Sequence, residues 1–199
     1  MITGNKKPLF VIGYAGSSMT DEFVQAINQT HSCKVIAPLD FYSMPEKINY
    51  QYIVSVSKDL RERLKIINFL EKEHLDMFTV MHETCFIGNN PVATVGAGSF
   101  IHPAVILCLG SSIGKNCIIG SMSMIGHYSS LGNNCILRPG VMIVGKSRVG
   151  DNCILNVRST IINQAQITDN VEILGFAQVR KNINDPGRYG GVPLKKFKD

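Results

Sequence analysis

Between residues 95 and 179 the chain repeats a six-residue pattern of apolar and polar positions. When this stretch is written in rows of six from Val95, the first position of every row is aliphatic and the fifth is small, with no insertion. A run of this length is not expected by chance, and it predicts a repeat architecture. The first column is Val95, Ile101, Leu107, Ile113, Ile119, Ile125, Leu131, Leu137, Ile143, Val149, Leu155, Ile161, Ile167, Ile173 and Val179.

A second period of 18 residues is superimposed on the first. The segments 113–118, 131–136 and 149–154 share the order aliphatic, Gly, any residue, Asn, Cys, Ile. Three hexads per period predict three flat faces and three corners per coil, with successive coils pairing at ~4.8 Å. The aliphatic column then fills a triangular parallel β-helix, and Asn suits corners that need a positive φ. Fourteen hexads predict between four and five coils.

The first 85 residues follow a different pattern, because short apolar runs alternate with helical periodicity. The predicted order is βαββαβ, a small Rossmann-like open α/β sheet. We therefore expect an α/β domain over residues 1–85, the β-helix over 86–180 and a tail over 181–199. The α/β elements are strands at 9–12, 34–39, 52–56 and 78–81 and helices at 21–29 and 58–73, the first helix capped by Ser18 or Thr20 and the second strand ending at Asp40.

A glycine-containing turn lies between the first strand and the first helix. Gly13 and Gly16 leave backbone N–H groups exposed at the positive end of that helix, which suits a phosphate. Ser18 stands where the dinucleotide fingerprint needs its last glycine. The turn therefore predicts an anion site of low specificity.

Charge changes this picture little. The net charge is +5, but residues 86–179 hold only eight charges and residues 180–199 hold six Lys or Arg against two Asp or Glu. A nucleic-acid-binding domain should carry a basic face rather than a basic end. The apolar runs are too short to span a membrane or to act as a secretory signal. We expect a cytoplasmic protein that binds neither nucleic acid nor membrane.

Cysteines and histidines give no metal site. No pair among the six cysteines has CxxC spacing, and Cys117, Cys135 and Cys153 fall in the small inward column, which predicts reduced core thiols. A catalytic zinc would need three converging ligands, whereas the repeat holds only His102 and His127. We expect no metal.

His127 is the candidate for chemistry. It is the third residue of its hexad, after Gly126, and should project outward near a corner. An imidazole with a reference pKa near ~6.5 can accept a proton from an attacking amine or hydroxyl. A surface histidine without a role is the alternative.

The whole chain resembles a known family. A small α/β domain, then a hexapeptide prism, then Gly190-Gly191-Val192-Pro193-Leu194-Lys195 is similar to bacterial UDP-4-amino-sugar N-acetyltransferases and sialic acid O-acetyltransferases. The resemblance implies a left-handed β-helix that forms a homotrimer and binds acetyl-CoA in the groove between adjacent prisms.

The resemblance also implies roles for particular residues. His127 would be the general base, and the backbone N–H of Gly145, one coil further on, would face the thioester carbonyl. The nucleotide-linked amino sugar would bind at Gly13, Ala15, Gly16 and Ser17, with Asp40 reaching the base or ribose. Acetyl-CoA would lie along Gly145, Val157, Gly175 and Lys195.

Some positions depart from the family pattern. Relatives usually carry His-Gly where this chain has Ser17-Ser18, and an acidic residue after the histidine where it has Tyr128. The scaffold therefore matches better than the acceptor pocket. The leading hypothesis is acetyl transfer to a nucleotide-linked amino sugar. Acetyl transfer to a sugar hydroxyl, as in sialic acid modification, and a non-catalytic trimeric nucleotide-binding module are the alternatives.

Overall fold

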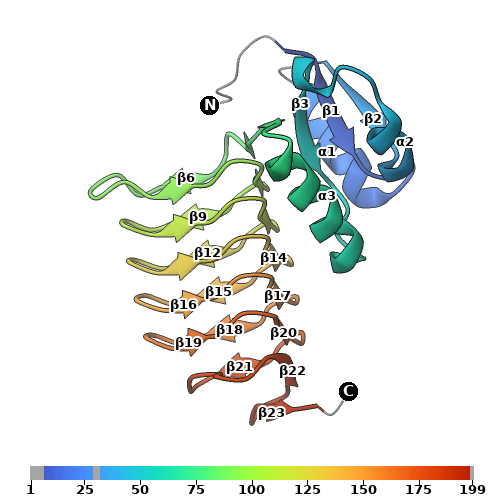
Figure 1. The fold of residues 1–199 in the computed structure, drawn as a ribbon. Helices are drawn as coiled ribbons and strands as arrows, with labels where there is room; N and C mark the ends of the chain where they lie inside the picture. The colour runs from blue at the N-terminus through green and yellow to red at the C-terminus, as the bar shows by residue number, and fades with distance from the viewer. Residues whose placement is uncertain (1–6, 29–31, 198–199) are drawn as a thin grey trace. The chain divides into compact units, whose positions relative to one another are not determined.

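The computed structural model describes residues 7–28 and 32–197. The chain divides into two compact units, residues 1–80 with 97–100 and residues 81–96 with 101–199 (Figure 1). The first is an α/β unit and the second is a β-solenoid. In the described residues, no helix is both long enough and apolar enough to cross a membrane.

The α/β unit contains a four-stranded parallel sheet in the order β2-β1-β3-β4. The chain passes from β1 to β2 on one side and then from β2 to β3 on the other side of β1. The gap between β1 and β3 is therefore a topological switch point, where open α/β sheets bind ligands. The elements are β1 Leu9–Ile12, α1 Ser18–Asn28, β2 Cys33–Ile36, α2 Pro38–Ser43, the 3-10 turn η1 Lys47–Asn49, β3 Gln51–Val54, α3 Leu60–Lys72 and β4 Asp76–Met77.

Two expected boundaries in this unit are wrong. The second strand ends at Ile36 rather than Asp40, because Pro38 starts the short helix α2. The fourth strand of the sheet is Asp76–Met77, whereas β5 (Val80–Met81) joins a sheet of the solenoid.

The core of the α/β unit lies mainly between β3, α2 and α3, where Tyr52, Phe41 and Leu70 are completely buried. Arg63 of α3 is also completely buried, and its Nη1 donates to the carbonyls of Val54 at 2.6 Å and Val56 at 2.9 Å. The guanidinium therefore fixes the backbone where β3 ends.

The solenoid is a left-handed β-helix whose two-residue strands stack in register at 18-residue intervals on three faces. The first face contains β6 Phe86–Ile87, β9 Ile106–Leu107, β12 Met124–Ile125, β15 Met142–Ile143, β18 Thr160–Ile161 and β21 Gln178–Val179. The second contains β7 Thr94–Val95, β10 Ser112–Ile113, β13 Ser130–Leu131, β16 Arg148–Val149 and β19 Gln166–Ile167. The third contains β5, β8 Phe100–Ile101, β11 Ile118–Ile119, β14 Ile136–Leu137, β17 Ile154–Leu155, β20 Val171–Ile173, β22 Gly187–Gly190 and β23 Lys195–Lys196.

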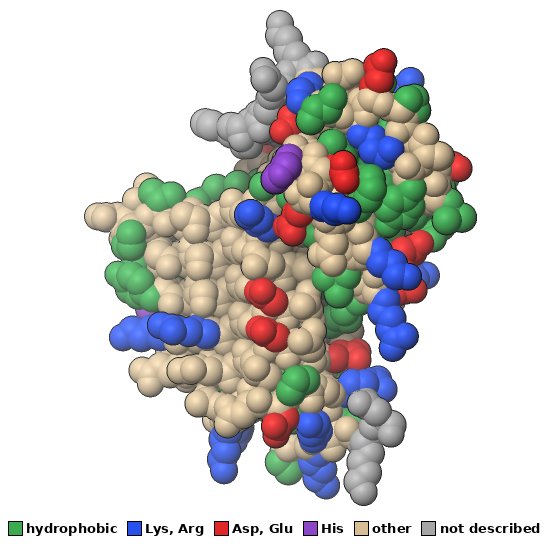
Figure 2. Space-filling view, in the orientation of Figure 1, with side chains coloured by type: hydrophobic (Ala, Val, Ile, Leu, Met, Phe, Trp, Pro, Cys, Tyr) green, Lys and Arg blue, Asp and Glu red, His purple; other side chains and the backbone are tan. Residues whose placement is uncertain are grey.

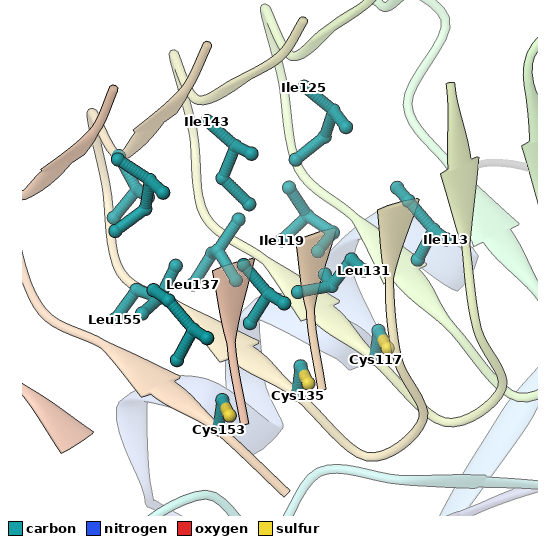
Figure 3. Packing of buried hydrophobic residues seen from close by; sticks show 14 of the residues in the cluster. Ile113, Cys117, Ile119, Ile125, Leu131, Cys135, Leu137, Ile143, Cys153 and Leu155 are labelled. Carbon is teal, nitrogen blue, oxygen red and sulfur yellow. The ribbon is translucent and has the colours of Figure 1, made fainter. Parts of the chain in front are cut away.

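Both predicted columns point into the prism. Every aliphatic residue of the first column is buried except Val95, which is half-buried, and every residue of the small column is buried. Figure 3 shows Cys117, Cys135 and Cys153 stacked one above another beside the aliphatic residues. The outside is charge-poor, and the solenoid face toward the viewer in Figure 2 is mostly neutral and polar.

The corners of the solenoid adopt left-handed backbone conformations. Asn116, Asn134, Asn152 and Asn170 have φ between 52° and 58° at the corner between the second and third faces, as predicted. Residues less suited to positive φ occupy the other corners, and Tyr128 with φ 56° is one of them.

The solenoid is longer than the predicted four to five coils, since its first face has six strands. At its beginning, residues 88–93 interrupt the hexads between β6 and β7. At its end, Ile183 rather than residue 185 pairs with Ile167, which breaks the 18-residue spacing. The regular hexads alone therefore underestimate the coils at both ends.

Candidate functional site

His127 lies at the corner between the first and second faces, immediately after β12, and is exposed. Its ring packs directly on Gly145 of the following coil: a Cβ on Gly145 would lie 2.6 Å from both Nδ1 and Nε2. Any larger residue at position 145 would displace the imidazole. The sequence-based pairing of His127 with Gly145 is therefore a direct contact in the structure.

Gly145 is buried beneath the His127 ring, and its N–H is one backbone donor at this corner without an acceptor among the described residues. Its neighbours are held in the ladder, because the N–H of Val144 donates to Ile161 and that of Lys146 donates to the carbonyl of His127. None of the described residues accepts a hydrogen bond from the Gly145 N–H. A backbone donor thus stands beside the imidazole, which is the pair of groups that acyl transfer needs.

Tyr128 completes this corner. The residue is 53% exposed, and its ring packs on Gly110 of the preceding coil, where a Cβ would lie 2.7 Å from Tyr128 Cδ1. The rings of His127 and Tyr128 have centroids 6.0 Å apart and planes at 84°. No described carboxylate makes a hydrogen bond or ion pair with His127.

Val157 and Gly175 stack on adjacent coils at a different corner, between the third and first faces. The N–H of Phe176 donates to the carbonyl of Val157, and a Cβ on Gly175 would lie 3.1 Å from Val157 Cγ1. This pair and the His127–Gly145 pair therefore border the same first face.

The first face is apolar between those corners. Four of its strands place hydrophobic side chains outward, and three more are exposed at the corner that contains Val157. Hydrophobic side chains also gather along the left edge of the solenoid in Figure 2. The residues of this surface are Phe86, Ile106, Met124, Met142, Met122, Val157 and Phe176.

A cavity of about 750 Å³ lies at the last coil of the solenoid. Arg180, Lys181 and Lys196 line it with one acidic residue, Asp185, and with apolar residues of the segment 192–194. The predicted Lys195 is exposed on β23 and is not among the lining residues, whereas its neighbour Lys196 is. The sequence-based prediction did not include Arg180 and Lys181. Their position in the basic segment 180–199 was the feature that could have indicated them.

The glycine turn of the α/β unit has the predicted shape. Gly13 is buried directly after β1, and a Cβ there would collide with the hydroxyls of Ser55 and Thr20. Ala15 and Gly16 are exposed, with Gly16 at φ 75°. The turn therefore presents its backbone at the amino end of α1.

Ser17, rather than Ser18 or Thr20, caps α1, because its Oγ accepts from the N–H of Thr20 at 3.2 Å. Thr20 in turn hydrogen-bonds Ser55 at 2.9 Å, so the hydroxyls link the loops that follow β1 and β3. A second link was not predicted: Tyr14 donates to Glu62 of α3 at 2.6 Å, which raises the pKa of the Tyr14 hydroxyl. Both links span the switch point.

We expected Asp40 to lie at the end of the second strand. Instead it lies exposed in the first turn of α2. A carboxylate there is stabilised by the helix dipole.

The core cysteines are donors in the ladder. The thiol of Cys117 donates to the carbonyl of Gly132 at 3.1 Å, and that of Cys135 donates to Gly150 at 3.1 Å. All six cysteines are free. Across the described residues, no group of three or more His, Cys, Asp or Glu could hold a metal ion.

Residues 110–145 match the family model for the bacterial transferase hexapeptide (six repeats). This segment of the solenoid is therefore similar to bacterial transferase hexapeptide repeats. The matched hexapeptide segment includes both His127 and Gly145. A comparison with curated protein sequences finds no match.

Solved structures share the fold over the whole chain. The acetyltransferase domain of PglB from Neisseria gonorrhoeae is 18% identical, with a TM-score of 0.84 over 96% of this chain and 100% of that one. PerB from Caulobacter crescentus, solved with CoA and GDP-perosamine, is 17% identical, with a TM-score of 0.83 over 100% of both chains. WeeI from Acinetobacter baumannii is 17% identical, with a TM-score of 0.68 over 95% of this chain and 99% of that one. The hexapeptide solenoid and its α/β unit therefore share their fold with these three proteins, one of which is an acetyltransferase domain.

Proposed function

We propose that this protein transfers an acetyl group from acetyl-CoA to the amino group of a nucleotide-linked amino sugar. The observation that carries the proposal is the packing of His127 on Gly145, beside a backbone N–H that no described residue accepts. The fold supports it, since PerB was solved with CoA and GDP-perosamine.

The chemistry follows from that pair of groups. The amine lone pair attacks the thioester carbonyl carbon, a C–N bond forms, and the carbonyl oxygen becomes an oxyanion. The Gly145 N–H donates to this oxygen, and loss of such a donor costs about 2.7–4 kcal/mol in other enzymes. His127 accepts the ammonium proton and returns it to the thiolate as the C–S bond breaks, leaving an amide and CoA. Base catalysis of this kind contributes about 10²–10⁴-fold.

Acetyl-CoA fits along the first face. Lys181 lies three 18-residue periods after His127, which is about 14 Å along the axis at ~4.8 Å per coil. A thioester at His127 would thus place its pantetheine arm over the apolar face and its phosphates toward the basic cavity. In this arrangement Gly145, Val157 and Gly175 border the arm.

We propose a homotrimer because the first face is otherwise exposed. A monomer that leaves Phe86 62% and Ile106 42% exposed on one flat sheet carries an apolar surface typical of an interface. Packing of a neighbouring prism on this face would cover it and enclose acetyl-CoA between subunits.

The α/β unit would bind the nucleotide at the switch point between β1 and β3. Backbone N–H groups of residues 13–17 would face the pyrophosphate at the amino end of α1. Asp40 remains a proposed contact to the base or ribose on the strength of the resemblance alone. Acetyl-CoA and nucleotide sugars are cytoplasmic metabolites, and we propose the cytoplasm as the site of action.

The test is thiol release from acetyl-CoA with UDP-, dTDP- and GDP-linked amino sugars, and with free sialic acid as the hydroxyl acceptor. We expect turnover with a nucleotide-linked amine, reduced at least 100-fold in His127→Ala and in Gly145→Ala, whose methyl group collides with the imidazole. His74→Asn, which changes an exposed histidine of the α/β unit, is the matched control.

Turnover of sialic acid alone would favour the hydroxyl transferase. Absence of acetyl-CoA binding by calorimetry, together with no turnover, would favour the non-catalytic module. Full activity in His127→Ala would refute the assigned base.

A further inference from the structure

Tyr128 stands beside His127 in a conformation fixed by the backbone. Its φ of 56° is the left-handed corner conformation that Lys146 and Gln164 also adopt on the next two coils. The Tyr128 N–H donates to the carbonyl of Leu109 at 3.1 Å, as the Lys146 N–H does to His127. The ladder therefore fixes the direction in which the Tyr128 side chain leaves the corner.

Packing fixes the ring itself. Gly110 forms a seat without a side chain, since a Cβ there would lie 2.7 Å and 2.8 Å from two Tyr128 ring carbons. Pro91 borders the same seat, 3.1 Å from that position, and its carbonyl accepts from the N–H of Gly110. The tyrosine ring thus rests on the preceding coil, while the His127 ring rests on the following one.

The two rings meet at nearly a right angle, 84°, with centroids 6.0 Å apart. An edge-to-face arrangement at this separation is a favourable geometry for aromatic rings. The imidazole therefore has packing partners on two sides, Gly145 and Tyr128, and no described carboxylate holds either nitrogen. A histidine base normally needs a partner that orients its ring.

We infer that Tyr128 is the positioning residue for His127, so that aromatic packing rather than a carboxylate orients the base. This inference rests on the proposed function of the His127 corner. Its consequence is electrostatic: among the described residues, no carboxylate bonded to the ring stabilises the imidazolium that forms when the amine proton is accepted. The other titratable side chains on the flanking turns are Cys108 and Lys146, and neither is an anionic partner.

Three substitutions separate packing from charge. Tyr128→Phe keeps the ring and should retain kcat. Tyr128→Ala removes the ring and should lower kcat about tenfold, a part of the 10²–10⁴ that a general base supplies, with KM for acetyl-CoA unchanged. Tyr128→Glu places a carboxylate beside the imidazole and should move the acidic limb of the kcat/KM profile upward by about one pH unit.

A second readout does not need turnover. The Cε1–H resonance of His127, assigned by its loss in His127→Ala, should titrate at higher pH in Tyr128→Glu and at wild-type pH in Tyr128→Phe. Asn170→Glu, a carboxylate at the exposed left-handed position of the corner between the second and third faces, is the control and should leave that titration unchanged.

An unchanged kcat in Tyr128→Ala, or an unmoved pH limb and titration in Tyr128→Glu, would overturn the inference. Failure of the proposed function looks different, because His127→Ala would then turn over as fast as the wild type whatever stands at position 128.

Discussion

The solenoid and the α/β unit bury polar groups in opposite ways. In the solenoid the same bond recurs coil after coil: the thiol of Cys135 and the hydroxyls of Ser129 and Ser147 each donate to a carbonyl 15 residues further on. In the α/β unit one buried guanidinium, that of Arg63, holds two carbonyls at the end of β3. The solenoid repeats its bond on many coils, whereas the α/β unit depends on one side chain. A single substitution should therefore lower the stability of the α/β unit more than that of the solenoid.

The largest expected effect is therefore in the α/β unit. Arg63→Ala leaves the carbonyls of Val54 and Val56 without this donor and opens a cavity at a completely buried position. We expect the unit to lose about 3–5 kcal/mol, because each carbonyl left without a donor costs about 1–3 kcal/mol and the truncated side chain leaves a cavity. Urea unfolding followed at 222 nm reports this unit, because every described α-helix lies in it.

Arg61→Ala is the matched control, since Arg61 is exposed on the same helix and only its backbone N–H bonds the capping Asp59. It should unfold within about 0.5 kcal/mol of the wild type, as surface substitutions usually do. Equal destabilisation by the two substitutions would show that α3 is merely sensitive to truncation and that Arg63 has no singular role.

The same contrast explains what the sequence could predict. The β-helix could be predicted because its sequence repeats. The inward columns, the Asn corners and the stacking of Cys117, Cys135 and Cys153 all follow from the 18-residue period. The helical spacing places Arg63 on the apolar face with Ile67 and Leu70. What the sequence could not show is that its guanidinium is buried there, because that depends on the carbonyls at the end of β3 that it bonds. Helix α2 was missed because the strand pattern was extended through Pro38 to Leu39 and Asp40.

The residues of the candidate site also differ in how far the repeat made them predictable. The neighbours His127 and Gly145 were predictable because the period brings residues 18 apart into contact. Tyr128 was visible only as a departure from a resemblance, and its packing on Gly110 required coordinates. The cavity with Arg180, Lys181 and Lys196 arises where the period fails near Ile183, so no column predicted it.

We expect the stability of the solenoid to depend on pH, because it contains a buried histidine. His102 is 8% exposed, and burial, together with the nearby His82, lowers the pKa of His102 from its usual 6.5 to about 4. The unfolded chain then binds the proton more tightly, so this contribution to stability is complete above pH 6.5 and is lost as the pH falls toward 4.

Between those limits we expect the solenoid to lose up to about 3 kcal/mol, from 1.36 kcal/mol per unit of pKa difference. His102→Gln should flatten this dependence in urea unfolding followed by the β-sheet signal at 218 nm. His127→Ala, which removes an exposed histidine of the same solenoid, is the control. A wild-type slope in His102→Gln would contradict the assignment.

The smallest loss of stability should come from substitutions in the cysteine column. A small loss is expected because the same side-chain-to-carbonyl bond is repeated on neighbouring coils. Burial raises the pKa of Cys135 well above its usual value, so the group is a neutral thiol that donates to the carbonyl of Gly150. Cys135→Ser keeps a donor of the kind that Ser129 and Ser147 already supply and should cost less than Cys135→Ala, which loses about 1 kcal/mol. Both values come from the 218 nm unfolding curves. If Cys135→Ser cost as much as Arg63→Ala, the thiol column would be as singular as the guanidinium, and the contrast between the two units would fail.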